Sequence, residues 1–275
     1  MLCPAKDRLV DLMEGSAQRI IDRSILSRVL KEYRSGDRTG AETYMRETLK
    51  MAPGEERSRC CLAALALETG DFDAAGQLLN ESGVETPGVE TLYLRGRLAE
   101  AQGDTAQARS HLIQALRIKP DYVGALYAMG RIMHRSGDQG QAANYYRKAL
   151  GRHPGFTAAA HQLGKVLFSM GRLDDALAAF RQALVADPTL TVVHMVMAST
   201  LREMGDGEQA RVVIQSALQK DDDPLLRIQH SLMLPIIFSA DTDIDDARAR
   251  TEKEMDGIGA RHIRSTDPFA FSGNT

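Results

Sequence analysis

Glycines recur along most of the chain at a nearly fixed interval of 34, 33, 34, 34 and 34 residues. They are Gly36, Gly70, Gly103, Gly137, Gly171 and Gly205. A period of this length predicts a solenoid, in which each repeat is one supersecondary unit that buries its apolar face on its neighbours. Such a chain forms one elongated domain without a single central core.

Two other residue types keep the same phase as the glycines. A small residue opens the next segment at Ala41, Ala75, Ala108, Ala142, Ala176 and Ala210. A proline ends it at Pro53, Pro87, Pro120, Pro154 and Pro188. Three registers that stay in phase predict a helix, a glycine turn, a second helix and a proline stop in each repeat.

The stretch of residues 156–188 gives the clearest example of this unit. Leu163, Gly164 and Leu167 share one face of a first helix, and Phe180 follows on the second. The glycine allows close approach of two backbones, and the phenylalanine is predicted to fill the space between neighbouring units. The residues predicted to be buried are Leu126, Met129, Tyr146, Leu163, Leu167, Phe180, Ala183 and Ile214.

This unit resembles the tetratricopeptide repeat family, and the resemblance covers residues 22–224. It implies an all-α, right-handed superhelical solenoid of about six helix-turn-helix repeats. Their expected bounds are 22–55, 56–88, 89–122, 123–156, 157–190 and 191–224. Residues 1–21 are expected to hold a capping helix, and residues 225–275 a helical extension outside the repeats.

The family resemblance also implies that the first helix of each repeat lines a concave surface. In the central repeats, the fifth and ninth positions of this helix alternate a ring with a cation. Positions four residues apart share a helix face. With two further ring residues, the predicted peptide-binding groove comprises Tyr93, Arg97, Tyr127, Arg131, His134, His161, Lys165 and Phe168.

A ring-plus-cation groove fits an extended acidic protein segment or a C-terminal carboxylate. Arginine holds carboxylates with two parallel hydrogen bonds, and tyrosine offers contact area with few torsions to freeze. The alternative is that the cations only solvate an exposed wall while the rings pack against the next helix. Both interpretations remain open at the level of sequence.

The C-terminal extension carries a second resemblance, to the segment that precedes the catalytic half of SPINDLY-like and O-linked N-acetylglucosamine transferases. The matching residues are Leu234, Pro235, Ile237, Phe238, Ser239, Arg248 and Arg250. The resemblance implies that a nucleotide-sugar-binding region would follow Asn274 and Thr275. Two functions are therefore considered, namely the partner-recruiting arm of a protein glycosyltransferase and a free-standing scaffold.

The remaining sequence features exclude several classes of function. No phosphate-binding glycine motif or HExxH spacing is present, and the three cysteines lack metal-ligand spacing, so no catalytic residue, cofactor or metal is predicted. A net charge of -3 gives no global attraction to nucleic acid, although a local basic strip is compatible with it. No apolar run approaches the ~20 residues of a membrane span. A cytoplasmic protein-binding chain is expected.

Overall fold

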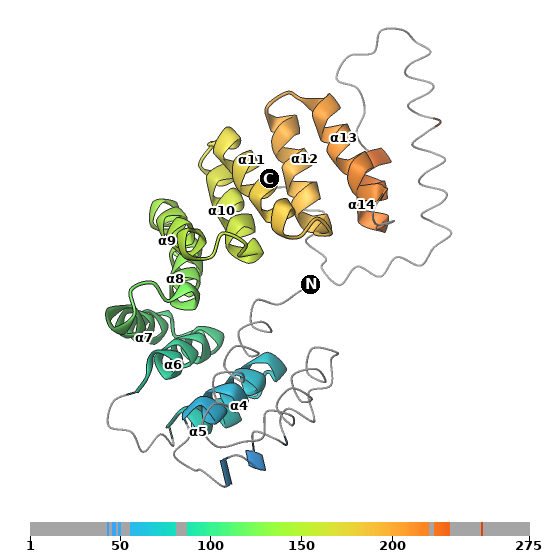
Figure 1. Cartoon of the computed structure of the whole chain (residues 1–275). Coiled ribbons are helices and arrows are strands. Elements are labelled where there is room, and N and C mark those ends of the chain that lie inside the picture. The colour runs from blue at the N-terminus through green and yellow to red at the C-terminus, as the bar shows by residue number, and fades with distance from the viewer. Residues whose placement is uncertain are drawn as a thin grey trace. The chain divides into compact units, whose positions relative to one another are not determined.

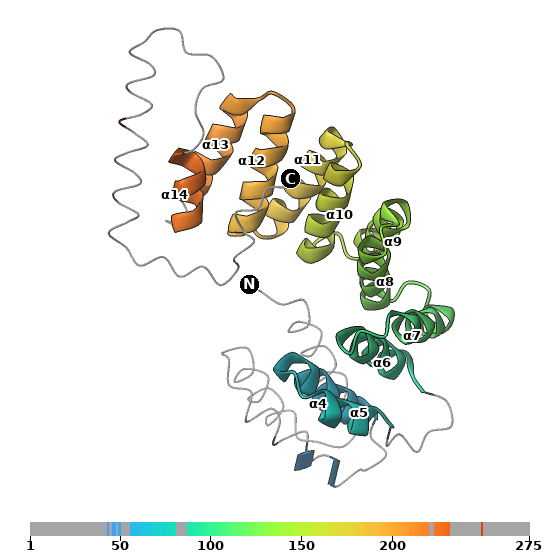
Figure 2. The same cartoon turned by 180° about the vertical axis from the view of Figure 1, so that it is seen from behind.

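The computed structural model describes residues 43, 46–47, 49–50, 56–80, 87–219, 223–231 and 249 (Figure 1; Figure 2). The predicted capping helix (1–21) lies outside these residues. So do most of the first repeat and the extension beyond Ser231, apart from Ala249. The bounds proposed for those segments stay predictions.

The described residues form helices only, and consecutive helices pack as helix-turn-helix pairs. The all-α prediction is therefore confirmed. The helices are α4 (Glu56–Thr69), α5 (Phe72–Asn80), α6 (Val89–Ala101), α7 (Thr105–Ile118), α8 (Val123–Arg135), α9 (Gln139–Arg152), α10 (Thr157–Ser169), α11 (Leu173–Ala186), α12 (Thr191–Glu203), α13 (Gly207–Leu218) and α14 (Pro224–Ser231).

The periodic glycines close the first helix of each pair in a left-handed conformation. Gly137 has a φ of 83°, and the backbone N–H of Asp138 donates to the carbonyl of Met133 at 2.9 Å. This is a Schellman arrangement, in which glycine avoids the steric cost of positive φ. The Asp138 carboxylate then accepts from the backbone N–H of Gln141 at 3.0 Å and caps the next helix.

The same glycine-aspartate turn precedes α5, α7 and α13, where Asp71, Asp104 and Asp206 are the caps. Before α11 the cap position holds Arg172, which makes no capping hydrogen bond. Its Nε instead donates to Asp175 Oδ2 at 2.8 Å, one turn into the helix. Two residues thus end one helix and begin the next at most of the turns.

A close contact between glycine and a large side chain holds the two helices of each central pair together. A Cβ placed on Gly130 would lie 2.5 Å from Cε1 of Tyr146, and one on Gly96 would lie 2.9 Å from Leu112. Gly164 faces Phe180 in the same way. Phe180 therefore packs over the glycine of its own pair, and its predicted contact between neighbouring units stays a prediction.

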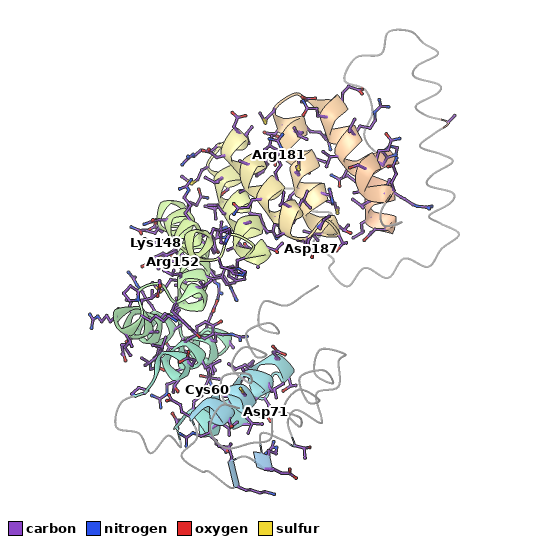
Figure 3. All side chains as sticks on the ribbon, viewed as in Figure 1. Cys60, Asp71, Lys148, Arg152, Arg181 and Asp187 are labelled. Carbon is purple, nitrogen blue, oxygen red and sulfur yellow. The ribbon has the colours of Figure 1, made fainter. Side chains whose placement is uncertain are left out.

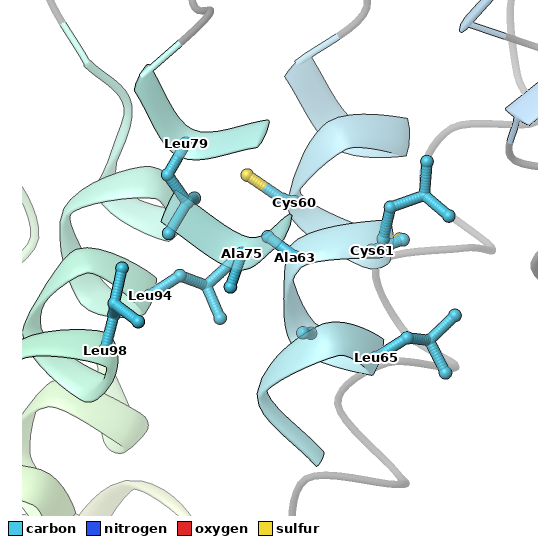
Figure 4. Close-up of a cluster of buried hydrophobic side chains, with 10 residues drawn as sticks. Cys60, Cys61, Ala63, Leu65, Ala75, Leu79, Leu94 and Leu98 are labelled. Carbon is cyan, nitrogen blue, oxygen red and sulfur yellow. The ribbon is translucent and has the colours of Figure 1, made fainter. Parts of the chain in front are cut away.

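The core follows the predicted pattern of residues. All eight side chains expected to be buried are buried. Cys60 and Cys61 are free thiols in a buried cluster of α4, α5 and α6, together with Ala75, Leu79 and Leu94 (Figure 4). Alanine and leucine dominate this cluster, as expected for a chain with 5% aromatic residues. Packing here depends on small residues that let the helices approach.

The chain divides into two compact units, residues 1–159 and 160–275. In unit one, each first helix contacts the first helix of the next pair, so α4, α6 and α8 form one layer. The second helices α5, α7 and α9 form a second layer that packs against the first (Figure 1). In unit two, α14 packs against α13 and α12, where the first helix of a further pair would stand, although its sequence has lost the repeat pattern.

Two glycine-to-alanine changes should shift stability in opposite directions. Gly130→Ala forces a methyl group into the ring of Tyr146, and we expect a loss of about 1–3 kcal/mol from overpacking. Gly151 lies in α9, and a Cβ built on it would meet no other atom within 4 Å, so Gly151→Ala should add up to about 1 kcal/mol of stability through helix propensity. Urea unfolding of both variants tests this, and equal effects would contradict the contact.

Candidate functional site

The eight residues of the predicted groove lie on three first helices, and none of their side chains is fully buried. Tyr93 and Arg97 belong to α6, and Tyr127, Arg131 and His134 belong to α8. These five lie in unit one. His161, Lys165 and Phe168 belong to α10 and lie in unit two. Each unit therefore carries its own part of the predicted set.

The tyrosine rings pack against aromatic residues at the ends of the connecting loops. Tyr93 meets Tyr122 edge to face, with ring centroids 5.5 Å apart. Tyr127 meets Phe156 in the same geometry at 5.0 Å, and its ring also lies 5.7 Å from that of Tyr146. Such pairs contribute stability beyond burial alone. Both tyrosines thus help to join repeats, as the packing alternative expected, while remaining partly exposed.

Arg131 is an ion-pair partner of Glu100, a residue that the sequence interpretation missed. The Arg131 Nη2 atom donates to Glu100 Oε1 at 2.9 Å, and Arg135 Nη2 donates to the same oxygen. The Glu100 side chain is 7% exposed, whereas those of Arg131 and Arg135 are 44% and 53% exposed. One buried carboxylate of α6 therefore holds two guanidinium groups of α8.

The position of Glu100 was a signal that could have been recognised from the sequence. It occupies the twelfth position of the first helix, which is His134 in the next repeat. It also lies in the last turn of α6, where the helix dipole disfavours a negative charge. An acid at that place requires nearby cations, and Arg131 and Arg135 lie four residues apart on the following first helix.

Arg97 differs from Arg131 in its surroundings. It is partly exposed on α6 and makes no ion pair with any residue that the structure describes. Its guanidinium group therefore keeps its hydrogen-bond donors for solvent or for a partner. Of the two arginines predicted for the groove in unit one, only Arg131 is held by a carboxylate of the chain.

A second polar contact ties α4 to α6. Glu56 Oε1 accepts from the backbone N–H of Gly88 at 2.9 Å and from the hydroxyl of Thr91 at 2.5 Å. The sulfur of Cys60 lies 3.4 Å from the same hydroxyl. Burial raises the pKa of Cys60 to about 12, so the thiol stays protonated and structural.

His161 is a ring of the predicted groove in unit two that stays uncharged at neutral pH. Burial is the main cause that lowers its pKa to about 4, and the charge of Lys165 one turn away adds to this. Its ring lies 6.3 Å from that of Phe180. His161 therefore acts as a packed ring, and the exposed Lys165 supplies the cation.

Exposed cations lie on α7 and α9, two of the second helices of unit one. Neither α7 nor α9 contains an acidic residue, and each has a cation in its last turn. Lys148 and Arg152 project from α9 in Figure 3, with the ammonium of Lys148 5.6 Å from the ring centre of Tyr145. Arg147 is exposed on the same helix. These cations belong to the layer opposite α6 and α8.

The described part of the chain was compared with two further kinds of site, a metal centre and a membrane span. It has no group of three or more His, Cys, Asp or Glu side chains that could hold a metal ion. None of its helices is long and apolar enough to cross a membrane.

The repeats match models of a known repeat family. Models described as Tetratricopeptide repeat match residues 26–88 and 93–155, and also 135–199 and 167–229. Together they cover well over half of the chain. The chain belongs to the tetratricopeptide repeat family. The matches end at residue 229, so no match supports the resemblance of residues 234–250 to a glycosyltransferase. No curated protein matches the sequence.

Several solved structures share this tetratricopeptide repeat fold. PilF of Pseudomonas aeruginosa is 15% identical, with a TM-score of 0.61 over 76% of this chain and 93% of its own. TTC0263 of Thermus thermophilus is 24% identical, with a TM-score of 0.56 over 65% and 98%. YrrB, described as a TPR protein with an unusual peptide-binding site, is 18% identical, with a TM-score of 0.52 over 66% and 94%. At these identities the likeness concerns the fold alone.

The lowered pKa of His161 predicts a loss of stability in acid. The folded tetratricopeptide repeat holds the ring neutral, so its contribution is complete above the unfolded pKa of about 6.5. It is lost as the pH falls from there to about 4, by about 1.4 kcal/mol per pH unit. Unfolding by urea between pH 7 and pH 4 measures this. His161→Gln is the control and should show a flatter pH dependence; parallel curves would contradict the burial effect.

Proposed function

We propose that the first helices of unit one bind an extended acidic segment of another protein. Tetratricopeptide repeats are in general protein-protein interaction scaffolds, and the family is established for this chain. The observation that carries the finer proposal is the row of partly exposed rings and cations on α6 and α8. Tyr93 and Arg97 form its first step, and Tyr127 and Arg131 form its second.

The electrostatics of this face favour an acidic ligand. Arg97, Arg131 and Arg135 contribute three positive charges, and Glu100 neutralises one of them. Tyr93 and Tyr127 are partly exposed and offer apolar contact beside the charges. A segment in extended conformation would meet one ring and one cation on each successive first helix, which suits the repeat spacing.

The packing of the tyrosines does not weaken this proposal. Contacts with Tyr122 and Phe156 fix the orientation of each ring, so a partner would pay little conformational entropy to use the exposed part of it. The same pattern of rings and a cation recurs on α10 in unit two, in His161, Lys165 and Phe168. The histidine ring is uncharged at neutral pH. We propose a further contact for them, independent of the face in unit one.

We also propose that the chain works in the cytoplasm. Cys60 and Cys61 are buried thiols that are adjacent in sequence, and neither forms a disulfide with a residue that the structure describes. Buried thiols of this kind suit a reducing compartment.

Removing the cations from the first helices should abolish capture of the partner. An Arg97→Ala, Arg131→Ala double variant loses both steps of the proposed face, and each change should weaken binding by about 1–3 kcal/mol. Affinity capture from the source organism's lysate, quantified by mass spectrometry, compares this variant with wild type. Arg147→Ala removes a cation from the opposite layer and is the matched control. Partners retained equally by all three chains would refute the proposed face.

A second candidate function is the partner-recruiting arm of a SPINDLY-like protein glycosyltransferase. The observation that favours it is the Leu-Pro-x-Ile-aromatic-Ser run of residues 234–239, followed by Arg248 and Arg250. In this proposal the repeats select the protein substrate, and a separate region performs the transfer. The free-standing scaffold remains the alternative, and the two differ in whether the repeats work beside a catalytic region.

The 275-residue chain by itself should bind no nucleotide sugar. The sequence holds no phosphate-binding glycine motif, so titration with UDP-N-acetylglucosamine should release no heat in a calorimeter. Turnover of the sugar by the purified chain, with a mock purification as control, would contradict both candidate functions. Reading the gene beyond codon 275 for a nucleotide-sugar-binding region separates the arm from the scaffold.

A further inference from the structure

The ion-pair cluster of Glu100, Arg131 and Arg135 has a geometry that the face of rings and cations does not explain. Both guanidinium groups donate through Nη2 to the same oxygen, Glu100 Oε1. An arginine side chain has five N–H donors, and one carboxylate oxygen uses few of them. With 44% and 53% of their side chains exposed, Arg131 and Arg135 keep further donors at the surface.

Glu100 stands where a carboxylate is costly. It is buried, and it lies at the negative end of α6. The desolvation cost of a buried charge is offset only if oppositely charged partners are held in good hydrogen-bond geometry. The two guanidinium groups provide that compensation, and in return Glu100 keeps two like charges side by side that would otherwise repel each other. The cluster retains a net charge of about +1, since two cations meet one anion.

The helix that carries Arg131 and Arg135 is fixed by its contact with α9. Tyr146 is fully buried on α9, and its ring packs against Tyr127 and over Gly130. Its hydroxyl has no hydrogen-bond partner among the described residues. Arg131 and Arg135 thus project from a helix that is packed tightly against α9, and their guanidinium groups stay partly exposed.

The cluster occurs at one junction of the described repeats. The place of Glu100 is taken by Leu67, His134 and Phe168 in other repeats, and that of Arg135 by Ser169 and Glu203. A ligand that slides by one repeat therefore loses the paired guanidinium groups. A single feature of this kind fixes the register of an extended segment that the repeating rings alone would leave open.

We propose that Glu100 is a positioning residue, which holds Arg131 and Arg135 as a paired anchor for one carboxylate of the bound segment. This inference rests on the proposed function and adds Glu100 and Arg135 to it. Because the two arginine side chains are already ordered, less conformational entropy is lost when the ligand binds. The bound carboxylate is either an acidic side chain or the C-terminus of the partner, because the two share the same chemistry.

The inference predicts an effect opposite to that of simple charge. Glu100→Gln removes a negative charge from a face that binds acids, so charge attraction alone predicts tighter binding. Loss of the anchor predicts weaker binding, by about fivefold or more. The probe is a fluorescein-labelled nonapeptide of alternating Glu and Gly, measured by fluorescence anisotropy at low salt with the full chain. Amidating its C-terminus tests whether the terminal carboxylate is the anchored group.

Two further variants keep the test decisive. Arg135→Ala leaves Glu100 paired with Arg131, so the fold is preserved, and we expect it to weaken binding about as much as Arg131→Ala does. Arg147→Ala on α9 removes one cation from the opposite layer and should leave affinity unchanged. Circular dichroism melts confirm folding of each variant, and Arg135→Ala decides the question if Glu100→Gln unfolds.

Nitrogen-15 signals of the arginine side chains separate positioning from a merely structural role. Peptide addition should shift the guanidinium signals of Arg131 and Arg135 in wild type and leave them unshifted in Glu100→Gln. If wild type binds the peptide and folded Glu100→Gln or Arg135→Ala binds equally or more tightly, the inference is wrong while the proposed function stands. If wild type binds no form of the acidic peptide, both are wrong.

Discussion

The close approach of two helices at a glycine is the contact on which the rest of this structure depends. Gly130 lies under the ring of Tyr146, and Gly164 lies under that of Phe180, sixteen residues later in each case. Ala198 and Ile214 are both buried and keep the same spacing. Here alanine stands in place of glycine, and isoleucine in place of the aromatic residue. The pairing of sizes conserves volume, which packed cores require. Once a small residue is paired with a large one at this contact, the solvent-facing positions of each helix are free to vary.

That freedom explains how far the sequence could predict the molecule. The turn glycines, the alanines and the prolines are imposed by backbone conformation and packing, so their period predicted helix pairs and all eight buried side chains. The positive φ at Gly137 and the cap at Asp138 are local effects, and local effects can be read from sequence. Periodicity gave the buried face of Phe180 and left open its contact with Gly164 in the same pair, because it does not say which neighbour a side chain meets.

The candidate site was predicted less completely for a physical reason. Helical spacing placed Arg97 and Arg131 on equivalent faces, and the structure gives them different surroundings. The difference comes from Glu100, a residue of a neighbouring repeat, 31 positions away from Arg131. An interaction between repeats does not follow from the pattern within one repeat. Likewise, the sequence predicted Tyr93 and Tyr127 as binding residues. Their ring contacts with Tyr122 and Phe156 show that each also packs between two repeats.

The ion pairs of Glu100 have a consequence for how such an array can change over generations. Repeats joined by alanine and leucine are interchangeable, because almost any neighbour offers an apolar surface. A duplication or deletion that separated α6 from α8 would leave a carboxylate buried at a helix end with no cation, an expensive error. The junction of the third and fourth repeats is therefore less exchangeable than a junction made by alanine and leucine alone.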